Sequence, residues 1–160
     1  MYKFVGRVVG FSFLTLALLA CVNLTIGIEF RPCSDGKPQP AIVHIEGCPQ
    51  MPCDIVRGGN STMTMVYLAP FDAQILRYVR YFTALGVTAP IPLDPERENG
   101  CNWLTGVSCP IRQGDLVIST HVSRPLPIYP LVSAVIEFNI LNEQDHVMVC
   151  FEYDIRIVVP

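Results

Sequence analysis

The sequence predicts an all-β domain, an immunoglobulin-like β-sandwich of two antiparallel sheets, and three observations support this fold class. Short runs of β-forming residues alternate between apolar and polar side chains. Clusters of Gly and Pro separate these runs, as in "RGGN", "APIPLDP" and "RPLPIYP". Six of the seven cysteines follow residue 27, an even set that suits a disulfide framework. Short strands at such intervals are typical of a β-sandwich.

The N-terminal residues 1–27 are predicted to be a secretory signal peptide. Lys3 and Arg7 form a short positive segment, and the apolar run Val8–Val22 follows it. The small residues of "TIG" then provide a cleavage site. A transmembrane anchor is the less favoured alternative, because the apolar run is short and no basic cluster follows it. We therefore expect a secreted protein, either extracellular or in the lysosomal lumen.

The remaining residues, 28–160, are predicted to form one domain, since about 130 residues can build one core but not two. Loss of Lys3 and Arg7 changes the formal net charge from −3 to −5. An acidic domain without a Lys/Arg run argues against nucleic acid as a partner. The sequence also lacks the G-x-S-x-G, H-E-x-x-H and phosphate-binding glycine motifs, so we expect no catalytic residue, metal or cofactor.

The stretch "GCPQMPC" places two cysteines close together, and a redox pair, a metal site and a disulfide are the possible roles. A redox motif uses a two-residue spacer, and a zinc site needs a second Cys or His pair, so a disulfide is favoured. Six cysteines allow fifteen pairings. Spacing favours two local bridges, Cys48–Cys53 and Cys101–Cys109, which leaves Cys33–Cys150 to join the two ends of the domain.

Six runs are predicted as strands. The second, for example, alternates Thr and Val with Met and Tyr, which indicates one buried face. The third could also form a helix, but its β-branched and aromatic residues and its place between two strands favour a strand. The only Trp lies in the Cys101–Cys109 loop, unlike the core Trp of an antibody domain. The runs are Ala41–Gly47, Ser61–Ala69, Ala73–Leu85, Asp115–Val122, Ser133–Leu141 and Cys150–Val159.

The order of motifs resembles that of the ML lipid-recognition family. The segments "FRPCSDG", "GCPQMPCDIVRGGN", "APIPLDPERENGC", "CPIRQGD" and "EFNILNEQDHVMVCFEYDIRIV" follow one another at spacings similar to those of the family's small secreted sterol carriers. The resemblance covers residues 30–158 and includes all six cysteines. It implies an immunoglobulin-like sandwich whose sheets part around an apolar pocket for one lipid. It also implies the three disulfides that spacing favours.

The resemblance further implies which residues contact the lipid. We expect the proline-rich connections 87–93 and 124–130 to form the pocket entrance, because proline stiffens loops that carry exposed apolar groups. Two departures from the family pattern lie there: an Ile at the position usually held by Phe, and a "PLPIYP" segment one residue shorter. From the pattern alone, Ile45, Ile55, Ile91 and Phe138 would be ordinary core residues. The expected entrance residues are Ile91, Leu126, Tyr129 and Pro130, and the expected interior residues are Ile45, Ile55 and Phe138.

The resulting functional hypothesis is a monomeric, non-catalytic carrier that binds one sterol or similar lipid and transfers it, with a membrane sterol acceptor protein as partner. About 28 heavy atoms at roughly 0.3 kcal/mol each would give about micromolar affinity, which suits reversible transport. A lipid-dependent recognition module in innate immunity or chemical sensing is the alternative. Sterol, fatty acid, microbial lipid and small volatile hydrophobes all remain compatible ligands. Asn60, in the sequon "NST", is predicted to be glycosylated.

Overall fold

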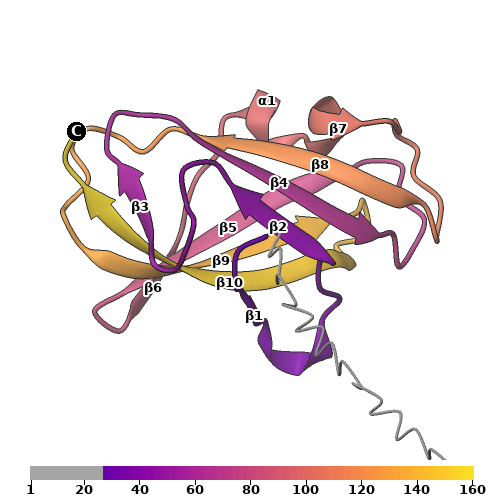
Figure 1. Ribbon diagram of the computed structural model, residues 1–160. Helices are drawn as coiled ribbons and strands as arrows, with labels where there is room; N and C mark the ends of the chain where they lie inside the picture. The colour runs from indigo at the N-terminus through magenta and orange to yellow at the C-terminus, as the bar shows by residue number, and fades with distance from the viewer. Residues whose placement is uncertain (1–26) are drawn as a thin grey trace, which may run out of the picture.

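The computed structural model describes residues 27–160, so the expected signal peptide lies outside the described residues apart from Gly27. Two sheets pack face to face in this part of the chain and form a β-sandwich (Figure 1). This architecture confirms the predicted fold class. Within the described range, no helix is long and apolar enough to span a membrane.

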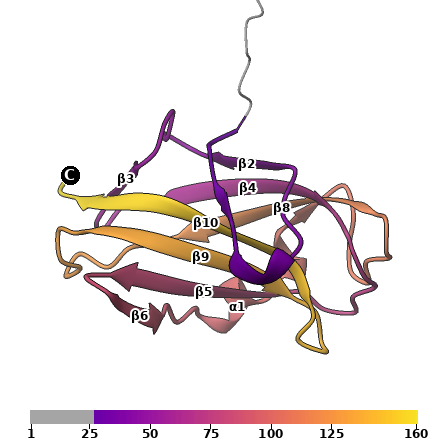
Figure 2. The same ribbon diagram turned by 90° about the horizontal axis from the view of Figure 1, so that it is seen from below.

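The larger sheet has six strands, five of which run in the order β1, β10, β9, β5, β6 (Figure 2). These five strands pair antiparallel, whereas β3 pairs in parallel with the C-terminal part of β10. The strands are β1 (Arg31–Pro32), β3 (Cys53–Val56), β5 (Arg77–Ala84), β6 (Val87–Pro90), β9 (Ser133–Leu141) and β10 (Val147–Val158).

The smaller sheet has four antiparallel strands in the order β2, β4, β8, β7. A short helix and two 3₁₀ turns lie in the connections. The strands are β2 (Ile42–Ile45), β4 (Ser61–Leu68), β7 (Leu104–Thr105) and β8 (Leu116–Ser123). The helical elements are α1 (Pro95–Glu98), η1 (Ser34–Gly36) and η2 (Gly100–Trp103).

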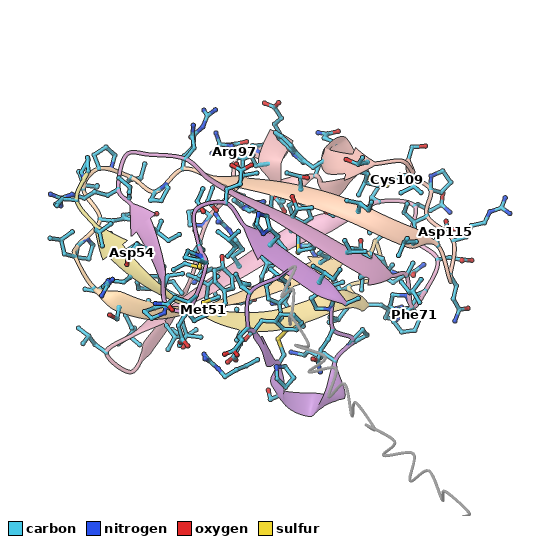
Figure 3. All side chains as sticks on the ribbon, in the orientation of Figure 1. Met51, Asp54, Phe71, Arg97, Cys109 and Asp115 are labelled. Carbon is cyan, nitrogen blue, oxygen red and sulfur yellow. A yellow bond between two sulfur atoms is a disulfide. The ribbon has the colours of Figure 1, made fainter. Side chains whose placement is uncertain are left out.

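Alternation of side chains decides which face of each long strand lies in the core, because successive residues point to opposite faces. In β4, Met63, Met65 and Tyr67 are buried, and the residues between them are half-exposed. The inward side chains of both sheets fill the space between the layers (Figure 3). The burial of Ile136 and Phe138 on β9 follows the same pattern, as the sequence predicts.

The first half of β10 departs from this alternation, since Met148–Phe151 are buried on both faces. The N-terminal segment covers the outer face here. The N–H of Cys150 donates to the carbonyl of Pro38 (2.7 Å), and Cys150 is bonded to Cys33. Asn139 is the register partner of Cys150 on β9 and is only 5% exposed. Strand alternation places Asn139 on the outer face of the sheet, and the covering segment explains its burial.

The six predicted strands are all present, but some boundaries differ, and β10 begins at Val147 rather than at the predicted Cys150. The run Ala73–Leu85 is a strand only from Arg77, because the carboxylate of Glu143 accepts from the N–H of Gln74 (2.9 Å) and holds the preceding residues in a loop. The segment 87–93, expected to be a connection, begins with the strand β6, which forms a hairpin with β5.

The turn of this hairpin consists of Leu85 and Gly86, both with positive φ (52° and 77°). Two residues of positive φ match the right-handed twist of the flanking strands, so this turn type is favoured in two-residue hairpin loops. Gly adopts this conformation without steric cost, whereas a leucine side chain is strained in it. Leu85 is also 94% exposed and gains no packing in return.

The structure contains the three expected disulfides, Cys33–Cys150, Cys48–Cys53 and Cys101–Cys109. The first spans 117 residues and ties the N-terminal segment to the middle of the larger sheet. The second closes the turn between β2 and β3, and the third closes the loop that carries Trp103. The stretch "GCPQMPC" is therefore a disulfide-bonded turn that leads into β3.

Candidate functional site

A cavity of about 250 Å³ lies between the two sheets. The strand ends that border it lie at the end of the sandwich that carries the C-terminus (Figure 1). The first residue of β4, Ser61, and the last residue of β8, Ser123, border it on the smaller sheet. Strands β5, β9 and β10 line it on the larger sheet. The sheets therefore part at this end.

The inner wall of the cavity is apolar and buried. It consists of Ile136 from β9 and of Ile155 and Ile157 from β10, each at most 5% exposed, together with Ile55 from β3. The two β10 residues alternate inward along their strand, so regular strand geometry creates the wall. A wall of this kind excludes water and favours an apolar ligand by the hydrophobic effect.

The rim is formed by the two proline-rich connections. The N–H of Ile91 donates to the carbonyl of Arg80 (2.9 Å), which extends the β5–β6 pairing and fixes Ile91 at the sheet edge. In the other connection, the N–H of Tyr129 donates to the carbonyl of Leu126 (3.1 Å). The turn at Gly58 anchors this loop, because its N–H donates to the carbonyl of Pro125 (2.8 Å).

Four of the seven residues predicted to contact lipid line this cavity: Ile55 in its wall, and Ile91, Leu126 and Tyr129 at its rim. The other three lie outside the lining, and lipid contact by all seven residues stays a prediction. Pro130 is exposed beside Tyr129. Ile45 and Phe138 are core residues, 1% and 0% exposed.

Phe138 lies outside the lining because it packs within a cluster of aromatic rings. Its ring centroid lies 5.4 Å from that of Tyr78, 5.2 Å from that of His121 and 5.6 Å from that of Phe151. These rings fill the core next to the cavity. Burial and the nearby charges of Arg80 and Arg97 lower the pKa of His121 to about 3, so its imidazole is neutral near neutral pH.

Sequence reasoning did not assign Arg80 to the site, nor the wall residues Ile136, Ile155 and Ile157. Arg80 lines the cavity from β5, between the inward-facing Tyr78 and Phe82, and is only 8% exposed. Its Nη1 donates to the hydroxyl of Ser123 on the opposite sheet (2.5 Å). The signal in the sequence is the charged residue at an inward position of the run "RYVRYF", where an apolar residue is expected.

The predicted glycosylation site, Asn60, lies next to the rim. It is exposed in the turn before β4, and its Oδ1 accepts from the Nε of Arg124 (3.1 Å). Arg124 itself lines the cavity. A glycan on Asn60 would therefore stand beside the cavity mouth.

The fold and this site define a class: disulfide-bonded, immunoglobulin-like β-sandwiches with an apolar cavity that opens at one end between the sheets. The family model of the ML domain matches residues 27–157. The chain belongs to the ML-domain family.

Curated relatives and solved structures agree with this assignment. NPC intracellular cholesterol transporter 2 of Bos taurus is 26% identical over 149 residues, which cover 91% of this chain and 95% of that protein. A Niemann–Pick type C2 protein from the Japanese carpenter ant has a TM-score of 0.72 at 20% identity, over 81% of this chain and 99% of that chain. Chicken MD-1, solved in complex with lipid IVa, has a TM-score of 0.51 at 14% identity, over 78% of this chain and 85% of that chain.

Proposed function

We propose that the protein is a non-catalytic lipid carrier that binds one lipid in the cavity between its sheets and transfers it. The observation that carries this proposal is the buried wall of Ile55, Ile136, Ile155 and Ile157, which opens through a rim of apolar loop residues. Membership of the ML-domain family supports it, since relatives are named as cholesterol transporters and one fold neighbour was solved with a lipid.

Transfer requires that the lipid leave the cavity toward an acceptor. Leu126, Ile128 and Leu131 lie in the loop at the rim and are 50%, 83% and 55% exposed. Exposed apolar side chains in one short loop are typical of a surface that contacts another protein or a membrane. We therefore place the contact with the acceptor at this loop, so that the lipid need not cross open water.

We also propose that the protein acts outside the cytosol, as the predicted signal peptide requires. The three disulfides support this destination, because such bonds form and persist in oxidising compartments. Both the extracellular space and the lysosomal lumen fit the proposal. Secretion of the full-length chain from transfected cells, with cleavage near Gly27 found by N-terminal sequencing, would test it.

The ligand itself can be identified from the natively secreted protein. Mass spectrometry of an organic extract should detect one lipid class at close to one molecule per protein. A parallel titration with fluorescent cholesterol and fluorescent fatty acid should give saturable binding of at least one probe. An empty extract together with no binding of either probe would contradict the proposed function.

The location of binding can be tested with charged substitutions at the rim. The double variant Ile91→Asp/Leu126→Asp should weaken binding by more than tenfold, because a ligand would have to contact two carboxylates on entry. The matched control is Phe71→Asp/Leu116→Asp, two exposed residues at the opposite end of the sandwich, where Figure 3 labels Phe71. Equal affinity of the two folded variants would contradict entry at this rim.

A further inference from the structure

The charge of Arg80 has no carboxylate partner among the described residues. Its guanidinium makes one hydrogen bond, from Nη1 to Ser123, and its Nε has no partner. The ion pairs found in residues 27–160 involve Arg31, Arg77, Arg97 and Arg156 instead. Arg80 is more than nine-tenths buried as a residue and lines the cavity, and the donor at its Nε is unused.

The other charged side chains of the cavity do not compensate for Arg80. Arg97 and Arg124 are cationic as well, and the only anionic side chain in the lining, Asp94, is exposed and paired with Arg97 (3.3 Å). The cavity thus carries an excess of positive charge, although the protein as a whole is acidic. This excess distinguishes the cavity from a purely apolar pocket.

Burial of an uncompensated charge is costly, and buried charges in folded proteins are usually paired. An apolar side chain would fill the same inward position on β5 without that cost. A guanidinium at this position is suited to bind an anionic ligand, because its planar donors match a carboxylate in a bidentate arrangement.

Resting on the proposed function, we propose that the cavity binds a lipid with a carboxylate head group, with Arg80 as the counter-ion of that carboxylate. The hydrocarbon part of the lipid would contact the isoleucine wall. Tyr153 is also in the lining, and its hydroxyl can donate a second hydrogen bond to the carboxylate head group. Ser123, which already accepts from Arg80, holds the guanidinium between the two sheets.

The test compares two lipids with the same chain and different heads, oleic acid and oleyl alcohol, by isothermal titration calorimetry on the delipidated protein. The wild-type protein should bind the acid at least tenfold more tightly than the alcohol. The variant Arg80→Met keeps the apolar length of the side chain. It should lose the preference for the acid and should still bind the alcohol. The control Arg112→Gln removes one exposed positive charge outside the cavity and should leave the preference unchanged.

A second measurement needs no variant. In protein with ¹⁵N-labelled arginine, the acid should shift the Nε resonance of Arg80, and the alcohol should not. Equal affinity of the wild-type protein for both lipids, or a full preference in Arg80→Met, would overturn the carboxylate assignment while leaving a lipid carrier. Failure of both lipids and of cholesterol to bind would instead overturn the proposed function.

Discussion

The buried imidazole of His121 should make the stability of this domain fall in mild acid. His121 is 2% exposed on β8, and its Nε2 has no hydrogen-bond partner among the described residues. It packs edge-on against the rings of Tyr78 and Phe138, both with centroids at 5.2 Å. Burial is the largest cause of its lowered pKa, and the positive charges of Arg80 and Arg97 act in the same direction.

The sign and the size of the effect follow from proton linkage. The pKa of His121 is about 3 in the folded state and 6.5 as the reference for the unfolded state. Between these values the unfolded chain binds a proton that the folded chain does not, so stability decreases as the pH falls below 6.5. One pKa unit corresponds to roughly 1.4 kcal/mol, so the loss at pH 4.5 is about 2–3 kcal/mol.

The assay is urea unfolding at pH 7.5 and pH 4.5, followed by the fluorescence of Trp103, for the wild type and for His121→Leu. Leucine is close to histidine in volume and does not titrate. Carboxylates titrate in both proteins, so the difference between the two pH-dependent losses isolates His121. The wild type should lose about 2–3 kcal/mol more than the variant. Equal losses would refute the reasoning, because they would mean that folding does not change the pKa of His121.

Three further predictions concern stability and modification. Leu85→Asn should raise the free energy of unfolding by about 1 kcal/mol, measured by thermal unfolding, because Asn tolerates positive φ and the exposed Leu85 loses no packing. Removal of Cys33–Cys150 should cost about 5 kcal/mol and removal of Cys48–Cys53 about 2 kcal/mol, given their loop lengths; equal losses would contradict this entropic account. Glycosidase treatment of the secreted protein should increase its mobility, and an Asn60→Gln variant should already migrate at the faster position.

Strand β5 was predicted from its β-forming residue types and its place between two strands, not from periodicity. The other long strands were predicted from periodicity, because each buries one face and repeats every second residue. Strand β10 illustrates this: Phe151, Tyr153, Ile155 and Ile157 are all buried, as the alternation predicts. Of the strands of two to four residues, only β2 was predicted, within the run Ala41–Gly47. The strands β1, β3, β6 and β7 were not predicted, since so few residues carry little pattern. Only their pairing with longer strands makes them regular.

The candidate site was predicted less completely, and the reason is geometric. The rim residues Ile91, Leu126 and Tyr129 could be placed from the resemblance and from the proline-rich loops that carry them. Whether a buried apolar residue faces a cavity or a close-packed core depends on how far two sheets separate, which no local pattern encodes. Phe138, predicted to line the interior of the pocket, packs among neighbouring rings next to the cavity, and its lipid contact stays a prediction.

The central claim is that one lipid lies inside the sandwich, against the isoleucine wall. Photolabelling with a diazirine-bearing fatty acid, followed by peptide mapping of the labelled protein, tests it most directly. The account predicts labels on cavity residues such as Phe82, Ile136 and Ile155, and their loss when unlabelled oleic acid competes. Labels confined to exposed apolar residues outside the cavity, such as Leu85 and Val87 on the β5–β6 hairpin, would contradict it.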